Sequence, residues 1–357
     1  FDFIKLYRGV TTLIYQVMGD IDMNIKDIAK IAKVGVSTVS RVLNNHPDVS
    51  DETREKVWQI IKENNYIPNN SARVLKQTNT RNIGVLVKGV FNPFFSEILK
   101  IISGGVEAAG YTMILQHHNN ESDIDTLLGF IKEKRLQGVI CLGGNFLELD
   151  DEHLEGAEAE VVLVSVDLVR IKNLKKCSSI SINNKKAAYE TIEYLINNGH
   201  NHIGLVLGDK KDIGVGKERF EGYLNALEAH KIEFREEYVT YGQYDSGTAY
   251  ERTKELLEEQ KDITAIFCTS DIMAIGVAKA IFDKGHKLGE DISLIGFDGM
   301  DVAKYYEPSI ATVKQPKYEM SNLSVELLLK LLNGEAKHQH IILPVELVQG
   351  GSCCKRN

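Results

Sequence analysis

The stretch VGVSTVSRVLN, at residues 34–44, predicts a short helix with two different faces. Val36, Val39 and Val42 recur at helical spacing, so one side of the helix can be buried. The opposite side carries small hydroxyl and amide side chains and one arginine, Arg41. A solvated helix face more often carries Glu and Lys, so this composition favours a surface that binds a partner.

The flanking sequence predicts two more helices, at 26–33 and at 51–65 with Ser50 as N-cap. Only two residues separate the first helix from the second, so the pair can bury its apolar faces only by crossing steeply, which gives a helix-turn-helix. The third helix then closes the core. The residues expected inside the first and third helices are Ile28, Ile31, Ala32, Val57, Ile60 and Ile61.

The chain has 357 residues and a net charge of −8, but this charge is unevenly distributed. Between Asn24 and Asn82 ten Lys and Arg residues face six Asp and Glu, so this segment carries +4 and the remainder −12. A basic module on an acidic body suits a DNA-binding unit attached to a soluble sensor. In such a unit the second helix enters the major groove, where an arginine can read guanine. A three-helix module that binds protein stays the alternative.

Residues 25–69, IKDIAKIAKVGVSTVSRVLNNHPDVSDETREKVWQIIKENNYIPN, resemble the headpiece of the LacI/GalR family of bacterial transcription repressors. The resemblance implies a homodimer that binds a palindromic operator in double-stranded DNA and responds to a small molecule, usually a sugar. It also implies that Val36, Ser37 and Arg41 face bases. The other operator contacts that it implies are Asn24, Thr38, Ser40, Asn44, Ser50, Thr53, Tyr66 and Asn69. The chain departs from the family at Lys33-Val34-Gly35, where Gly-Val-Ser is usual.

Residues 70–81 are interpreted as a hinge between this headpiece (24–69) and the rest of the chain. Two helical turns are too short to persist alone in water. By resemblance, the segment folds when two copies pair over the operator. Ala72 and Arg73 would then touch the minor groove, and Leu75 would insert between base steps.

From Asn82 onwards, strand-like and helical runs alternate, which predicts parallel sheets covered by helices on both sides. The resemblance implies two subdomains of the periplasmic-binding-protein type, with the effector held between them. We expect the first subdomain to comprise residues 82–182 and 315–340. We expect the second to comprise 183–314 and 341–352, followed by a tail at 353–357.

Ligands of such folds lie beyond the carboxyl ends of the strands, and the candidate effector residues are taken from there. An aromatic wall with charged and amide groups suits a carbohydrate. The candidates are Phe94, Phe95, Arg219, Tyr244, Ser270, Asp271, Asp298 and Gln315. Each has a structural alternative: the two phenylalanines could be core, Arg219 a surface ion-pair partner and Asp298 a helix cap.

Several other classes find little support in the sequence. No G-x-G-x-x-G follows the first strand, no P-loop is present, and the cysteines lack metal-site spacing, so we expect no cofactor, no metal and no catalysis. Residues 1–23 look like a non-native or disordered extension, and no transmembrane or signal segment is expected, which predicts a cytoplasmic protein. A sugar receptor without DNA function, or an enzyme acting on a sugar or nucleoside, stays the alternative.

Overall fold

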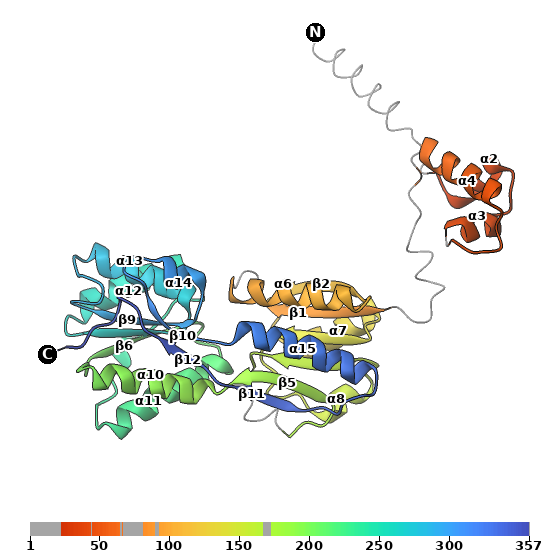
Figure 1. Ribbon diagram of the computed structural model, residues 1–357. Helices are drawn as coiled ribbons and strands as arrows, with labels where there is room; N and C mark the ends of the chain where they lie inside the picture. Colours follow the sequence, from red (N-terminus) through yellow and green to blue (C-terminus); the bar gives the residue numbers. More distant parts are fainter. Residues whose placement is uncertain are drawn as a thin grey trace, which may run out of the picture. The chain divides into compact units, whose positions relative to one another are not determined.

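The computed structural model describes residues 23–43, 45–64, 66, 81–89, 93–166 and 173–356, and these form two separate units (Figure 1). The first unit is Phe1–Asn79 and the second Thr80–Asn357. In the described residues, no helix has the length and apolar character needed to cross a bilayer.

The first unit is the predicted helix-turn-helix with a third helix, and its fold class is confirmed. It contains α2 (Ile25–Ala32), α3 (Val36–Leu43) and α4 (Asp51–Glu63). Ser50 caps α4, as expected, by accepting a hydrogen bond from the backbone N–H of Thr53. The buried core residues of the unit are Ile28, Ala29, Ala32, Val39, Val42, Val49, Val57, Ile60 and Ile61.

One of the core positions predicted for the first and third helices is wrong. Ile31 is 46% exposed, whereas Ala29 is buried beside Ile28 and Ala32. Positions 28, 29 and 32 lie on one helical stripe, and this stripe faces the core of the unit.

The turn before α3 carries a residue in a strained backbone conformation. Lys33 ends α2 with φ 56°, in the left-handed region, and its N–H bonds the carbonyls of Ala29 and Lys30. This conformation costs a residue with a Cβ about 1 kcal/mol or more, and glycine adopts it freely. The tight turn is therefore retained in this chain although lysine disfavours the backbone conformation that Lys33 adopts.

Lys33→Gly should raise the free energy of unfolding of the first unit by about 1 kcal/mol, because it removes this strain. The single tryptophan of the chain, Trp58, lies in α4, so its fluorescence during urea unfolding reports on this unit alone. The matched control is Lys62→Gly within α4, which should lower stability by about 1 kcal/mol. Destabilisation by both variants would contradict the strain at Lys33.

The second unit consists of two α/β lobes, which share no sheet. The N-lobe sheet is entirely parallel, in the order β11-β5-β4-β3-β1-β2. Its strands are β1 (Asn82–Lys88), β2 (Thr112–His118), β3 (Gly138–Leu142), β4 (Glu160–Val164), β5 (Cys177–Ile182) and β11 (His340–Leu343). Its helices are α6 (Pro93–Ala108), α7 (Asp123–Lys134), α8 (Asp151–Glu155) and α15 (Lys317–Leu332).

The C-lobe sheet has the order β12-β10-β9-β8-β6-β7, with only β12 antiparallel. Its strands are β6 (Ile203–Leu207), β7 (Val239–Tyr241), β8 (Ala265–Cys268), β9 (Ser293–Asp298), β10 (Ala311–Lys314) and β12 (Glu346–Val348). Its helices are α10 (Asn184–Asn197), α11 (Val215–Ala229), η1 (Glu236–Tyr238), α12 (Ser246–Glu259), α13 (Asp271–Asp283) and α14 (Asp301–Tyr305). Two doubly wound parallel-sheet lobes are the predicted class, which is confirmed.

The chain passes between the lobes three times, and one passage differs from the prediction. β5 ends at Ile182 in the N-lobe, and β10 ends at Lys314 in the C-lobe. The third passage does not follow residue 340, because Ile341–Leu343 pair with β5 in the N-lobe sheet. The chain leaves that sheet at Pro344, which has no N–H to continue the ladder.

Strand β5 is a further difference from the prediction, because its polar sequence CSSISI is buried along its whole length. The hydroxyls of Ser178, Ser179 and Ser181 lie within hydrogen-bonding distance of His338, His340 and the carbonyl of Val166, respectively. Partners distant in the sequence therefore satisfy the hydrogen bonds of these serines. A search for apolar runs does not find a buried strand of this kind.

Candidate DNA-binding and effector-binding sites

Helix α3 exposes the residues that the sequence assigned to bases. Val36 is 42% exposed, and Ser37 and Arg41 are also exposed, while Val39 and Val42 face the core. Thr38 and Ser40 are half-buried at the margin of this face. The helix therefore presents one arginine among small side chains on a surface that a partner can approach closely.

The operator contacts predicted at the starts of α2 and α4 lie at helix N-termini. Asn24 caps α2 in a capping box with Asp27, and Ser50 caps α4 with its hydroxyl bonded to Thr53. Helix N-termini attract anions because their amide groups point outwards. Tyr66 is half-buried and packs on the headpiece core. The predicted contacts that lie outside the described residues are Asn44, Asn69, Ala72, Arg73 and Leu75.

In the C-lobe, three of the predicted effector residues meet at the carboxylate of Asp298. Ser270 donates to Asp298 Oδ2 at 3.1 Å, and the Gln315 amide donates to Oδ1 at 2.8 Å. All three residues are buried. They come from the carboxyl ends of β8, β9 and β10, which are neighbours in the sheet.

Arg219 lies at the same edge, on α11. Its guanidinium donates to Asn184 Oδ1 at 3.0 Å and to the Thr269 carbonyl at 2.7 Å. It also stacks 3.7 Å from the ring centroid of Phe297. Arg219 is 4% exposed, so the alternative of a surface ion pair is wrong. Asn184, which orients this arginine, was not found by sequence reasoning.

Asp271 is fully buried and lies next to the same edge. Its two oxygens accept hydrogen bonds from the Thr312 hydroxyl and the Met300 N–H, both at 2.7 Å. Burial, with repulsion from Asp298, raises the pKa of Asp271 to about 8. Burial also raises the pKa of Asp298 to about 6, although Arg219 opposes this shift. The hydrogen bonds from Thr312 and Met300 give Asp271 a structural role. Asp298 is then the carboxylate at the centre of this edge.

Tyr244 is the predicted aromatic wall of the pocket, and the structure places it in a strained turn with φ 53°. Its hydroxyl donates to Asp212 Oδ2 at 2.7 Å. Its ring lies on Gly208, where an added Cβ would approach the ring to 2.1 Å. A glycine at 208 and a carboxylate at 212, neither of them predicted, therefore fix this ring beside the end of β6.

Phe94 and Phe95 differ from their predicted place at the mouth of the pocket. They lie in the N-lobe core, 2% and 8% exposed. Phe95 shares a helical face with Ile98 and Ile102, and that face packs inwards. The burial agrees with the alternative of core packing.

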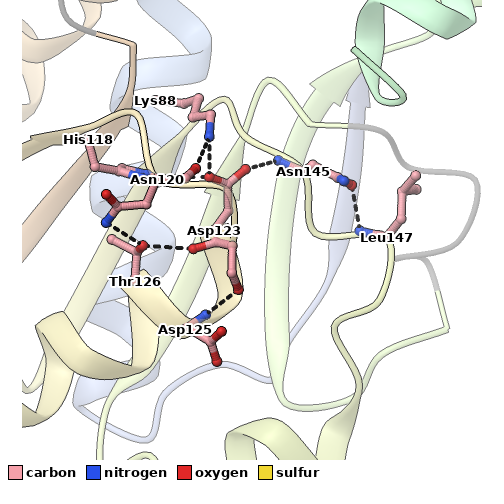
Figure 2. Close-up of polar contacts among 9 residues, drawn as sticks. Lys88, His118, Asn120, Asp123, Asp125, Thr126, Asn145 and Leu147 are labelled. Carbon is pink, nitrogen blue, oxygen red and sulfur yellow. Dashed lines mark hydrogen bonds and ion pairs between the residues drawn. The ribbon is translucent and has the colours of Figure 1, made fainter. Parts of the chain in front are cut away.

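The carboxyl edge of the N-lobe sheet carries a second polar cluster that the sequence analysis did not find (Figure 2). Asp123, at the start of α7, accepts hydrogen bonds from Lys88 Nζ at 2.7 Å and from the Asn145 N–H at 2.6 Å. Lys88 ends β1 and also donates to the carbonyl of Asn120. The ring of His118, at the end of β2, lies 3.7 Å from the Asp123 carboxylate. Asp123 thus joins the ends of β1 and β2 to the loop that begins at Gly143.

This N-lobe loop approaches the C-lobe. A Cβ built on Gly214, at the start of α11, would lie 3.9 Å from the carbonyl oxygen of Gly144. Asp212 holds the C-lobe loop by accepting from the N–H groups of Gly214 and Gly216. One carboxylate in each lobe, Asp123 and the half-buried Asp212, therefore holds a loop that faces the other lobe.

Three of the five cysteines lie in the cores of the lobes. Cys141, Cys177 and Cys268 are free and buried. Burial raises the pKa of Cys177 to about 12 and that of the other two further, which suppresses the reactive thiolate. Within the described ranges, no three His, Cys, Asp or Glu residues are grouped to hold a metal ion.

His118 predicts a pH dependence of stability. Burial lowers its pKa from the ordinary value of 6.5, with Asp123 opposing and Lys88 adding to the shift. The buried neutral ring is therefore fully accommodated above pH 6.5, and stability is lost as the pH falls through the folded-state pKa. His118→Gln should reduce this loss, as measured by urea unfolding at about pH 7.5 and about pH 5.5. His117→Gln, at an exposed neighbouring ring, is the control, and an equal effect of both variants would contradict the assignment.

The sequence matches two families: bacterial regulatory proteins of the lacI family over residues 24–69, and the periplasmic binding protein-like domain over residues 192–353. It is 56% identical over 333 residues to the HTH-type transcriptional regulator MalR of Clostridium butyricum, covering 93% of this chain and 99% of the relative. It is 32% identical over 320 residues to the repressor PurR of Aliivibrio salmonicida, covering 89% and 94%.

Two solved structures extend this similarity to three dimensions. The lac repressor dimer bound to operator and the anti-inducer ONPF has a TM-score of 0.69 at 27% identity, over 93% of this chain and 99% of that one. The transcriptional regulator CelR in complex with cellobiose has a TM-score of 0.66 at 26% identity, over 92% and 99%. Together with the identity to MalR over nearly the whole chain, these similarities show that the protein belongs to the lacI family of bacterial transcriptional regulators.

Proposed function

We propose that this protein is a repressor that binds a palindromic operator as a homodimer and releases or holds it in response to a sugar. The observation that carries the proposal is the exposed face of α3, with Arg41 among small side chains, on a unit separate from the lobes. The second unit supplies a polar edge centred on Asp298, which is suited to sense a small molecule.

A sugar fits the chemistry of this edge. Paired hydroxyls of a sugar can donate to a carboxylate or amide oxygen and accept from a guanidinium. Gln315 Oε1 is buried and accepts no hydrogen bond from the described residues, so it retains capacity for a donor. CelR, which has a similar structure, binds cellobiose.

Two exposed aromatic residues of the C-lobe support association with a second copy of the chain. Phe282 at the end of α13 is 71% exposed, and Tyr305 in the adjacent α14 is 76% exposed. Large exposed apolar side chains on helices that contact each other are typical of association surfaces. The similar lac repressor is a dimer on its operator, and two headpieces suit a palindrome.

A sugar receptor without DNA function is the second candidate, since the lobes alone would serve it. The headpiece, with its basic charge and exposed α3, favours the repressor. An enzyme finds less support, because Asp271 and Asp298 are engaged in hydrogen bonds within the protein. Retention of a palindromic fragment selected from random DNA distinguishes the repressor from both alternatives.

Arg41→Ala should relax base preference, because the guanidinium reads a base, with a loss of about 1–3 kcal/mol on the selected operator and little loss on random DNA. Lys30→Ala, at an exposed position on α2, should weaken both DNAs alike and reduce the salt dependence. Titrations with fluorescent duplexes at several salt concentrations measure both effects. Equal losses on operator and random DNA for Arg41→Ala would rule out its role in base reading.

Arg219→Met and Asp298→Asn should each abolish the response to sugar. A ligand present at about 100 times its dissociation constant adds about 2.7 kcal/mol of stability, so a thermal-shift screen of monosaccharides and disaccharides should identify it. The control is Arg252→Met, at an exposed ion pair of the same lobe. A shift that survives both substitutions would place the ligand elsewhere.

A further inference from the structure

The segment Asp298–Met300 belongs to the C-lobe but also contacts the N-lobe. Its Met300 is buried in the N-lobe core, in the same cluster as Phe94 and Ile98 of α6. The N–H of Met300 donates to Asp271 of the C-lobe at 2.7 Å. This short segment is therefore held by both lobes at once.

Lys317 forms the polar part of the same connection. It begins α15 of the N-lobe, and its side chain is 12% exposed. Its Nζ donates to the carbonyl of Gly299 in the C-lobe at 3.1 Å and pairs with Glu97 of α6 at 2.8 Å. The lysine thus joins a backbone oxygen next to Asp298 to a helix of the other lobe.

The turn that carries Asp298 has little freedom to move independently of Lys317. Asp298 has φ 115° and Gly299 has φ 69°, and a Cβ on Gly299 would lie 2.6 Å from Lys314. Two residues before Lys317, the Gln315 N–H donates to the Asp298 carbonyl while its side chain holds the carboxylate. A displacement of the carboxylate should therefore displace the Gly299 carbonyl as well.

We propose that Lys317 is a positioning residue: its bridge from Gly299 to Glu97 ties the Asp298 turn to α6 and so transmits occupancy of the Asp298 edge to the N-lobe. The second part rests on the proposed function, in which Asp298 contacts the effector. Helix α6 packs along α15 and follows β1, the first strand after the segment that leads from the headpiece. Helix α6 is therefore close in sequence to the DNA-binding unit, and a change in lobe geometry that reaches it acts on this part of the chain.

The bridge is tested without any ligand by measuring the distance between the lobes in the full chain. Spin labels are attached at Lys132→Cys in the N-lobe and Glu259→Cys in the C-lobe, both exposed positions. Cys353→Ser and Cys354→Ser remove the accessible native thiols. In the pulsed electron paramagnetic resonance distance distribution, Lys317→Met should shift or broaden the peak, because the lobes lose their polar tie.

The matched control is Lys330→Met, which breaks an exposed Lys330–Glu326 pair on the same helix. Glu97→Gln tests the bridge from its other end and should change the distribution in the same direction as Lys317→Met. Lys317→Arg should restore the wild-type peak, because it keeps the donor and the charge. A wild-type distribution for both Lys317→Met and Glu97→Gln would overturn the proposal.

A second measurement adds the sugar that stabilises the wild type most in the thermal-shift screen. The wild-type peak should move on addition of this sugar, and Lys317→Met should reduce the movement about threefold or more while the sugar still binds. An equal movement in both proteins would overturn the transmission role. Failure of every sugar to stabilise the wild type would count against the proposed effector, whereas the ligand-free distances would still decide on the bridge.

Discussion

The structure of the second unit depends on the burial of a carboxylate, Asp298, at the boundary between the two lobes. A buried carboxylate is tolerated only when hydrogen bonds and nearby positive charge replace its lost hydration. Ser270, Gln315 and the nearby Arg219 provide these here, and they come from separate elements. Satisfying this one group therefore fixes the carboxyl edges of neighbouring strands and the passage of the chain into α15.

The N-lobe repeats the same principle with Asp123, which holds Lys88 and the loop at Asn145 (Figure 2). Each lobe thus builds its edge around a buried carboxylate. The loop that Asp123 holds faces the C-lobe at Gly144, opposite Gly214 in the loop that Asp212 holds. Because a buried carboxylate without partners is costly, the stability of each edge depends on the hydrogen bonds that its carboxylate accepts. A ligand that supplies or removes one hydrogen bond at such an edge can therefore favour one arrangement of the lobes over another.

The sequence predicted what depends on local pattern: the three headpiece helices, the βα alternation, and the position of Arg219, Ser270 and Asp298 at or just after strand ends. The predictions were wrong where tertiary packing determines which residues are buried. Ala29 is buried and Ile31 is exposed, because the core of the packed helices lies on the face of α2 that carries Ala29. Strand β5 is buried despite its serines because distant histidines pair with two of them. Lys88, Asp123 and Lys317 were missed, since a charged residue at a strand or helix end usually signals solvent. Only the burial and the hydrogen-bond partners of these three side chains indicate their structural role.

The central claim is that ligand binding at the Asp298 edge and DNA binding by α3 are linked, and linkage must be reciprocal. The most direct test measures the dissociation constant of the stabilising sugar with and without a saturating operator fragment, and that of the operator with and without saturating sugar. The account predicts the same factor in both directions, of about 5–150-fold. Affinities that do not change in either direction would contradict it.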